Sequence, residues 1–334
     1  MDYNFDYTIE LNSSYREKIS SNRELITVFT PSYNRARFLP RVAECLVNQT
    51  SKDFVWIVVN DGSEDNTDIV MKEIMVKETL PIKYISKSNG GKHTAFKAAI
   101  DNAETVYFSI WDDDDIYDPQ IIEFYLNKWE EIKKKKLDKI GAIKTLAKRE
   151  DGTYLTNFPI TSENHGKEYV TTKLENDYVY HRLQENNSCY DTEKLKSIDL
   201  FPTSYWLFKQ HKFFQEGIWH GRFARKYTCL FVNKAFREYR YDDDVSLMRQ
   251  PKSHQFYLDR FINAKMIMDE QFDYISLSRK RLIKRCIVIN WLRSYAGISF
   301  KDMIKHTSLS QLRFMYKMAY PTSFLCKMYV KIKC

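Results

Sequence analysis

The sequence predicts an α/β fold with a mainly parallel central sheet, and three observations support this prediction. Short apolar, β-prone runs alternate with segments whose apolar residues recur at helical spacing. The runs are apolar throughout, which is typical of parallel strands that are buried on both faces. A polar turn follows each run. Because ligands of such sheets bind beyond the carboxyl ends of the strands, these turns form the expected binding edge.

The alternation of strands and helices is regular up to about residue 136. The strands are expected at Leu25–Phe29, Phe54–Val59, Ile82–Ile85 and Val106–Ile110. Each is followed by an expected helix: the first places Leu39, Val42, Ala43 and Leu46 on one face, the second begins at Asp65 or Asn66 and places Ile69, Val70, Ile74 and Met75 on one face, the third spans His93–Asn102, and the fourth runs from Pro119 to about Lys136. Beyond residue 140 the pattern is weaker, and it predicts a helix at Lys212–Tyr227, a strand at Cys229–Val232 and a helical segment from about Tyr257.

Composition excludes several classes of protein. At 334 residues and 43% hydrophobic, the chain can bury a large core. Its seven histidines form no HxxxH or HxH pair and its six cysteines no CxxC spacing, which counts against a zinc site and a disulfide framework. No apolar stretch reaches the roughly 18 residues that a membrane span needs, and no signal peptide is visible. These features favour a cytoplasmic protein with reduced thiols.

The net charge of +8 is concentrated at the C-terminal end. Residues 277–334 carry 13 Lys and Arg against one acid, Asp302, a net +12 that leaves −4 for the rest of the chain. Such an asymmetry predicts an anionic partner: a membrane leaflet, a nucleic acid or a lipid-linked phosphate.

Four consecutive carboxylates, Asp112–Asp115, follow Trp111 at the end of the fourth strand. Their mutual repulsion is costly, and a divalent metal with a polyphosphate is the simplest agent that relieves it. Asp112 and Asp114 lie two apart, so both point to one side and could share the metal, whereas Asp113 would face a ribose hydroxyl and Asp115 could cap the next turn. The alternative is a solvated acidic loop, which the adjoining buried strand disfavours.

Polar turns also follow the other three strands. Thr30–Asn34 offers an aromatic face, hydroxyls and free backbone groups for a base and ribose, although it could be a plain turn. In Asn60–Ser63, an aspartate can accept from a base N–H while a glycine permits close approach, but the same tetrapeptide is a common turn. In Asn89–His93 a lysine opens a helix, against the helix dipole, which favours pairing with phosphate or the aspartates. There His93 either orients a diphosphate or lies on the surface.

Taken together, these turns resemble family 2 glycosyltransferases of the GT-A fold. The resemblance covers about residues 23–120 and lies in Val28–Arg35, Val58–Ser63, Asn89–Lys92 and Asp112–Asp115, with Pro119 downstream. It implies a GT-A type α/β/α sandwich that takes a sugar from a nucleotide-diphosphate donor, usually UDP-linked, and inverts the anomeric configuration in one displacement. Trp111 departs from the smaller aliphatic residue that is common in the family, which could reshape the strand end.

The resemblance also assigns site residues. Pro31, Tyr33 and Asp61 would surround the nucleoside, and Asp112–Asp114 would be the DXD element, with Asp114 the most direct ligand of Mg2+ or Mn2+. The full expected set for the nucleotide-sugar is Thr30, Pro31, Tyr33, Arg35, Asp61, Asn89, Gly91, Lys92, Asp112 and Asp113, with Asp112 and Asp114 for the metal.

Glu216 is the expected catalytic base. Inversion needs one carboxylate opposite the leaving diphosphate, whose charge the metal and Lys92 would stabilise. Many family members place an acidic pair at a helix start in this region, and here Gly217 replaces the second acid. The alternative is a glutamate that merely favours the helix dipole. Trp219 and His220 could line the acceptor site, and Trp219 could equally belong to the core.

The chain is expected to comprise an arm (1–22), a catalytic domain (23–245) and a basic helical C-terminal region (246–334). Within the domain, 23–120 would bind the nucleotide-sugar and 121–245 the acceptor. In the C-terminal region, Leu282, Cys286 and Ile289 at helical spacing among basic residues suit a helix on an anionic membrane, and equally a packed appendage or an oligomer contact. The acidic run Asp242–Asp244 is expected to be a solvated loop, with a closing loop as the alternative.

The expected reaction builds a surface polysaccharide or glycoconjugate on a glycan or lipid-linked acceptor, in the cytoplasm or at the inner face of the cell membrane, and no nucleic-acid partner is expected. Two rival hypotheses remain. A sugar nucleotidyltransferase needs a glycine-rich basic loop after the first strand, where residues 30–35 contain no glycine. A non-catalytic scaffold on a decayed transferase fold is disfavoured by the intact aspartates and Lys92 but kept open by Gly217.

Overall fold

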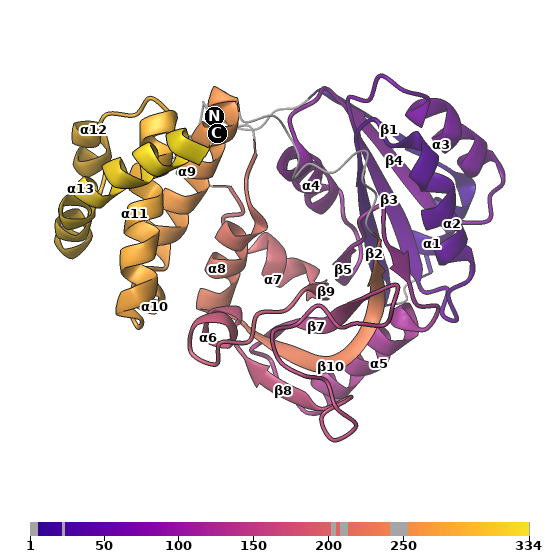
Figure 1. The fold of residues 1–334 in the computed structure, drawn as a ribbon. Helices are drawn as coiled ribbons and strands as arrows, with labels where there is room; N and C mark the ends of the chain where they lie inside the picture. Colours follow the sequence, from indigo (N-terminus) through magenta and orange to yellow (C-terminus); the bar gives the residue numbers. More distant parts are fainter. Residues whose placement is uncertain (1–5, 22–23, 202–204, 208–212, 241–252, 334) are drawn as a thin grey trace.

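The computed structural model describes residues 6–21, 24–201, 205–207, 213–240 and 253–333 (Figure 1). A mixed sheet runs through the molecule in the order β1-β4-β3-β2-β5-β9-β7-β10-β6, with β8 alongside β10. The strands are β1 (Tyr7–Leu11), β2 (Ile26–Ser32), β3 (Phe54–Asp61), β4 (Ile82–Lys87), β5 (Tyr107–Ile110), β6 (Ile116–Tyr117), β7 (Ile140–Arg149), β8 (Glu168–Thr171), β9 (Asn186–Asp191) and β10 (Thr228–Tyr239).

The parallel character of the sheet is concentrated in the strands that the sequence predicts. Strands β4, β3, β2 and β5 are parallel neighbours, so their carboxyl ends share one edge. Beyond β5 the pairing alternates, because β9 runs antiparallel to both β5 and β7, while β7 and β10 are parallel. The weaker sequence pattern after residue 140 therefore corresponds to the mixed part of the sheet.

Helices cover both faces of the sheet, as expected for an α/β/α sandwich. On one face, α2 (Leu39–Val47), α3 (Thr67–Val76) and α5 (Ile121–Lys134) enclose a core with Trp56 and Val58. On the other, α4 (Lys92–Asp101), α7 (Thr192–Lys196) and α8 (Glu216–Lys226) pack on Phe29 and Ile57. The 3-10 turn η1 (Ala36–Phe38) precedes α2, and α6 (Lys173–Tyr178) follows β8.

Three expectations about local structure were wrong. The predicted arm over residues 1–22 instead supplies β1, which pairs antiparallel with β4, and α1 (Ser13–Ile19), whose buried Tyr15 packs with Val55. In α3 the buried face includes Met71, Ile74 and Met75, whereas Ile69 is 58% exposed. The helix predicted from residue 212 begins at Glu216, and residues 208–212 lie outside the described part of the chain.

The C-terminal region is a helical unit that joins the sheet's core. It contains α9 (His254–Glu270), α10 (Phe272–Ile275), α11 (Arg279–Tyr295), α12 (Phe300–Lys305) and α13 (Ser310–Lys333). Leu282, Cys286 and Ile289 are buried in the cluster that also covers the α4 and α8 face of the sheet, so the apolar stripe of α11 is used in packing. Figure 1 shows these helices beside α8. The predicted boundary at residue 245 and Asp242–Asp244 lie outside the described residues.

Across the described residues, none of the helices combines the length and the apolar character needed to cross a membrane.

Candidate active site

The turns after β2, β3 and β4 are tied together at the carboxyl edge of the sheet. Asn34 adopts a left-handed conformation (φ 54°). Its backbone N–H donates to Ser63 Oγ at 2.9 Å, and its Oδ1 accepts from Glu64 N at 2.7 Å. At Gly62 (φ 74°) an added Cβ would lie 2.5 Å from Asn89 N, so only glycine lets these two turns approach. The expected binding edge is therefore one hydrogen-bonded surface.

Asp61 stabilises this edge through hydrogen bonds of its buried carboxylate. Its carboxylate is buried and accepts from Lys87 Nζ at 2.5 Å, from Gly90 N at 3.0 Å and from Gly91 N at 2.7 Å. A contact with a nucleoside base, as expected for Asp61, would be added to these bonds. Asp61 thus holds the Asn89–Gly91 turn, and through it the start of α4.

The aspartate cluster alternates as the sequence predicts. Asp113 and Asp115 are buried, whereas the side chain of Asp114 is 34% exposed. Arg35 bridges two of them: Nε lies 2.7 Å from Asp113 Oδ1 and Nη2 lies 2.7 Å from Asp114 Oδ2. Arg41 Nη2 donates to the carbonyl oxygen of Asp114 at 2.7 Å. The cost of adjacent carboxylates is therefore offset here by Arg35 from the turn after β2, while Arg41 on α2 holds the backbone of Asp114.

Lys92, at the start of α4, joins the aspartate cluster to the expected base. Its Nζ lies 2.7 Å from Asp112 Oδ1 and 3.2 Å from Glu216 Oε1. Burial alone would lower the pKa of Lys92, but the two carboxylates outweigh it and raise that pKa. Burial likewise opposes the ionisation of Asp112, yet Lys92 and Arg237 bring its pKa down to about 2. Asp112, Lys92 and Glu216 form a charged triad, and Glu216 contributes from the first turn of α8.

The other two aspartates are shifted in the opposite direction. Burial raises the pKa of Asp113 to about 7 in spite of Arg35, and the pKa of Asp115 to about 6 in spite of Arg237. Asp113 Oδ2 is buried without a hydrogen-bond partner among the described residues. Asp115 does not cap the next turn: it accepts from Arg237 Nε at 2.6 Å and from Arg240 N at 3.1 Å.

Two expected contacts are corrected by the structure. Thr30 is fully buried and its hydroxyl accepts from Trp56 Nε1 at 3.0 Å, so its side chain supports the sheet and does not face a ligand. His93 neither reaches a diphosphate nor lies on the surface. It is buried edge-on against Phe214, with ring centroids 5.0 Å apart, and burial lowers its pKa to about 4. By contrast, Tyr33 is 44% exposed at the edge, as a base-stacking residue requires.

The aromatic residues near the site serve different purposes. Trp111 is fully buried and stacks on Tyr117 at 4.0 Å, so it fills the core below the aspartates. Trp219 is also core and packs on Phe96. His220 instead lines a cavity and lies 3.1 Å from the hydroxyl of Tyr190. Of the two residues expected at an acceptor site, only His220 lines this cavity.

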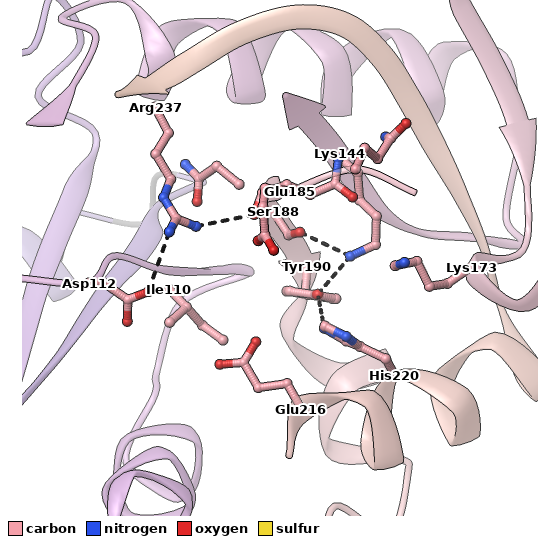
Figure 2. Close-up of a pocket in the computed structure, with 13 residues that line it drawn as sticks. Ile110, Asp112, Lys144, Lys173, Glu185, Ser188, Tyr190, Glu216, His220 and Arg237 are labelled. Atoms are coloured by element: carbon pink, nitrogen blue, oxygen red, sulfur yellow. Dashed lines mark hydrogen bonds and ion pairs between the residues drawn. The ribbon is translucent and has the colours of Figure 1, made fainter. Parts of the chain in front are cut away.

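A polar cavity of about 290 Å³ opens between the aspartate cluster and α8. Figure 2 shows Asp112 and Arg237 at one end and Lys144, Lys173 and His220 at the other, with Glu216 between them. Strand β9 contributes Asn187, Ser188 and Tyr190 to the wall. The candidate base and the candidate metal ligand thus border one shared space.

Sequence reasoning missed Arg237, Lys144 and Asn187. All three lie on strands of the mixed part of the sheet, where the alternation gives no reliable register. For Arg237 one signal existed, because four adjacent carboxylates need more cations than Lys92 supplies. Lys144 and Asn187 reach the cavity only through the antiparallel pairing of β7 with β9.

Architecture and site together define the class: the fold is of the GT-A type, with an acidic binding edge at the strand ends. Residues 27–158 match the model of the family described as "Glycosyl transferase family 2". Over these residues the chain is similar to glycosyl transferase family 2.

Known relatives match about a third of the chain. An uncharacterized glycosyltransferase of Rickettsia prowazekii (strain Madrid E) is 36% identical over 103 residues, which is 31% of this chain and 31% of that protein. A chondroitin synthase of Pasteurella multocida (strain Pm70) is 33% identical over 105 residues, 31% of this chain and 11% of the relative. The match therefore takes in less than a third of either relative's length.

Solved structures extend the similarity to the whole fold. The crystal structure of S. aureus TarS 1-349 in complex with UDP-GlcNAc superposes with a TM-score of 0.54 at 16% identity, over 89% of this chain and 91% of that chain. The UDP complex of the same protein gives a TM-score of 0.53, over 90% of each chain. At this identity the likeness shows the fold alone, and it includes the helical C-terminal region.

Proposed function

We propose that this protein transfers a sugar from a nucleotide-diphosphate donor, UDP in the first place, to a hydroxyl of a glycan acceptor. The observation that carries the proposal is the triad of Asp112, Lys92 and Glu216. One lysine ammonium contacts both the candidate metal ligand and the candidate base, at 2.7 and 3.2 Å. Leaving-group stabilisation and deprotonation of an acceptor are thereby brought to one place.

Donor binding would use the edge that the first four turns form. Tyr33, exposed beside Pro31, offers a face for the base, and Asp61 holds the Asn89–Gly91 turn in place for it. The buried and unpartnered Asp113 Oδ2 is an acceptor suited to a ribose hydroxyl. The UDP and UDP-GlcNAc complexes of TarS, which shares the fold, support UDP as the first nucleotide to test.

The carboxylates at this edge fit a divalent metal whose remaining ligands the substrate would supply. Among the described residues, no group of three or more His, Cys, Asp or Glu side chains is placed to hold a metal on its own. Mg2+ is commonly held by about one or two carboxylates together with substrate phosphates. Asp112 and Asp114 would hold Mg2+ or Mn2+, and the bound ion would neutralise charge that develops on the diphosphate. In the structure Lys92 pairs with Asp112 and Arg35 pairs with Asp114.

The transfer itself is a single displacement with inversion. The acceptor hydroxyl attacks the anomeric carbon, its proton passes to Glu216, and the sugar–phosphate bond breaks with its electron pair going to the diphosphate. Lys92 then faces the departing phosphate from the start of α4. Because only one carboxylate is required, Gly217 in place of a second acid does not impair this scheme. An added Cβ at Gly217 would meet only ordinary contact, 3.6 Å from Ile267 Cδ1.

The proposed acceptor follows from the names of the relatives. Relatives named chondroitin synthase and hyaluronan synthase support a product in polysaccharide or glycoconjugate synthesis. A lipid-linked acceptor, a cytoplasmic location and contact of the basic C-terminal helices with the inner face of the cell membrane belong to the same proposal.

Calorimetric titration of UDP tests the proposed function. Wild-type protein is titrated with Mn2+ or with EDTA, and the titration is repeated for Asp114→Ala and for Asp138→Ala, an exposed aspartate that precedes β7 at the opposite edge of the sheet. We expect metal-dependent binding in the wild type and Asp138→Ala and its loss in Asp114→Ala. Product analysis with a panel of UDP-sugars then separates sugar transfer, which releases UDP, from the nucleotidyl transfer of the rival hypothesis, which would require added pyrophosphate and yield UTP and a sugar phosphate.

The proposal is overturned if UDP, GDP and dTDP all fail to bind in the presence of metal. That outcome would favour the scaffold hypothesis.

A further inference from the structure

The cavity beside the triad contains a buried lysine, Lys144, that is not held in an ion pair within the described residues. Lys144, on β7, is 2% exposed, and its Nζ donates to Ser188 Oγ and to Tyr190 OH, both at 3.0 Å. Among the described residues no carboxylate forms an ion pair with it. Since an ammonium group has three N–H bonds, these two hydroxyls leave one N–H without an acceptor in the part of the chain that the structure describes.

Other groups of the same wall are also unsatisfied. Asn187 lies on β9 and is 2% exposed. Its buried Nδ2 and the buried Nε2 of Gln184 have no hydrogen-bond partner in the described part of the chain. Lys173 lines the same cavity and is held by Asp177 at 2.5 Å. Lys144 and Lys173 both act electrostatically on His220, and burial together with these two cations lowers the pKa of that histidine well below its usual range. This end of the cavity therefore presents N–H donors and positive charge.

The carboxylates of the cavity do not pair directly with Lys144. Asp177 and Glu216 act on it electrostatically, but the ion pairs of Asp112 and Glu216 are formed with Lys92. Glu185 is exposed at the rim, where it acts on Arg237. Figure 2 shows Asp112 on one side of the cavity, Lys144 with Lys173 on the opposite side, and Glu216 between them. The positive end thus lies across the cavity from the reaction centre.

We propose that this cavity binds a saccharide unit that carries an anionic group, a carboxylate or a phosphate, which Lys144 holds with the help of Lys173 and Asn187. The inference rests on the proposed function, and it names the substrate class of that same site. The anionic sugar is either the transferred sugar of the donor or the accepting sugar, since in the proposed function both sugars would meet in the space between Asp112 and Glu216. The volume of about 290 Å³ suits a single sugar unit, because it lies at the small end of ligand pockets.

Stability does not explain why a lysine occupies this position. A buried ammonium without a carboxylate costs folding free energy, and burial lowers the pKa of Lys144 for that reason. A methionine of similar length would fill the same space without that cost, as replacement of buried charges by apolar side chains shows elsewhere. A ligand anion would supply the missing counter-charge.

The test compares anionic with neutral sugars on wild type, Lys144→Met and the control Lys128→Met, whose lysine pairs with Glu131 and Glu168 outside the cavity. In the donor arm, UDP-glucuronate and UDP-glucose are titrated with Mn2+. In the acceptor arm, methyl glucuronide, glucose 6-phosphate and methyl glucoside are titrated into protein saturated with UDP and Mn2+. Thermal unfolding of each variant is measured in parallel.

We expect wild type and Lys128→Met to prefer the anionic ligand by about tenfold or more in one of the arms, the size of a charge-assisted hydrogen bond. Lys144→Met should lose this preference, keep its affinity for UDP and unfold at the same or a higher temperature. The arm that responds identifies the donor or the acceptor as the source of the anion.

The inference is overturned if neither arm shows a preference while UDP binds normally, or if Lys144→Met keeps the preference. A fall in unfolding temperature without any change in ligand preference would show that Lys144 has a structural role only. Absence of UDP binding to the wild type would instead count against the proposed function, a result that is distinguishable because it appears before any sugar is compared.

Discussion

The C-terminal helices should position the candidate base, and Asn263 is the residue that tests this. Asn263 lies on α9 and is 1% exposed. Its Oδ1 accepts from Gln215 N, the N-cap of α8, at 2.9 Å, and its Nδ2 donates to the carbonyl of Phe213 at 2.7 Å. The first turn of α8, which carries Glu216, is thereby fixed by a residue about 50 positions away.

Truncation of Asn263 to alanine leaves two partly buried backbone groups unsatisfied. At about 1 kcal/mol for each such group, the free energy of unfolding should fall by about 2 kcal/mol, or roughly 3 °C in Tm for a chain of 334 residues. If the loss of the hydrogen bond to Gln215 raises the activation free energy by the same amount of about 1 kcal/mol, because Glu216 is less well positioned, kcat falls roughly fivefold, since about 1.36 kcal/mol corresponds to a factor of ten.

Asn290→Ala is the matched control. Asn290 is equally buried, and its Nδ2 donates to the carbonyls of Cys286 and Tyr316, both at 3.1 Å and both within the C-terminal helices. We expect both variants to lose a similar amount of stability, and only Asn263→Ala to lose kcat for sugar transfer and to exchange the first α8 amides faster with deuterium. Equal kcat values in the two variants would refute a positioning role of the C-terminal helices.

Three further predictions follow from the geometry of the site. Glu216→Gln should lower kcat by about 10²-fold or more while UDP affinity is retained, because a general base typically contributes that much; an unchanged rate removes Glu216 from the mechanism. Burial lowers the pKa of His93 from 6.5 to about 4, so between these pH values the unfolded state binds more protons than the folded state. The free energy of unfolding of the wild type should therefore fall by up to about 3 kcal/mol between pH 7 and pH 4, relative to His93→Phe. If the free energies of unfolding of the two proteins change equally with pH, the prediction is wrong. Gly62→Ala should destabilise the edge by about 1–3 kcal/mol and weaken UDP binding, because φ is +74° and the new Cβ would meet Asn89 N at 2.5 Å; Gly152→Ala, at φ +83° with nothing near its Cβ, is the control for strain alone.

The sequence by itself determined the parallel half of the sheet and the residues at its edge. Strands β2, β3, β4 and β5 are apolar runs bounded by polar turns, a local pattern that depends on burial on both faces. Parallel strands bring such turns to one edge whatever the rest of the chain does, so Lys92 and Asp112 could be expected to meet. Their ion pair at 2.7 Å confirms that expectation.

Only the tertiary structure decided what surrounds that edge. Tyr7–Leu11 reads as a polar arm because an edge strand is buried on few of its positions, and its pairing with β4 is non-local. Lys144, Asn187 and Arg237 enter the site through strand pairings between distant segments, for which the sequence gives no register. Whether a polar side chain such as Thr30 faces a ligand or the core likewise depends on contacts across the sheet, here with Trp56, and these form only when the chain has folded.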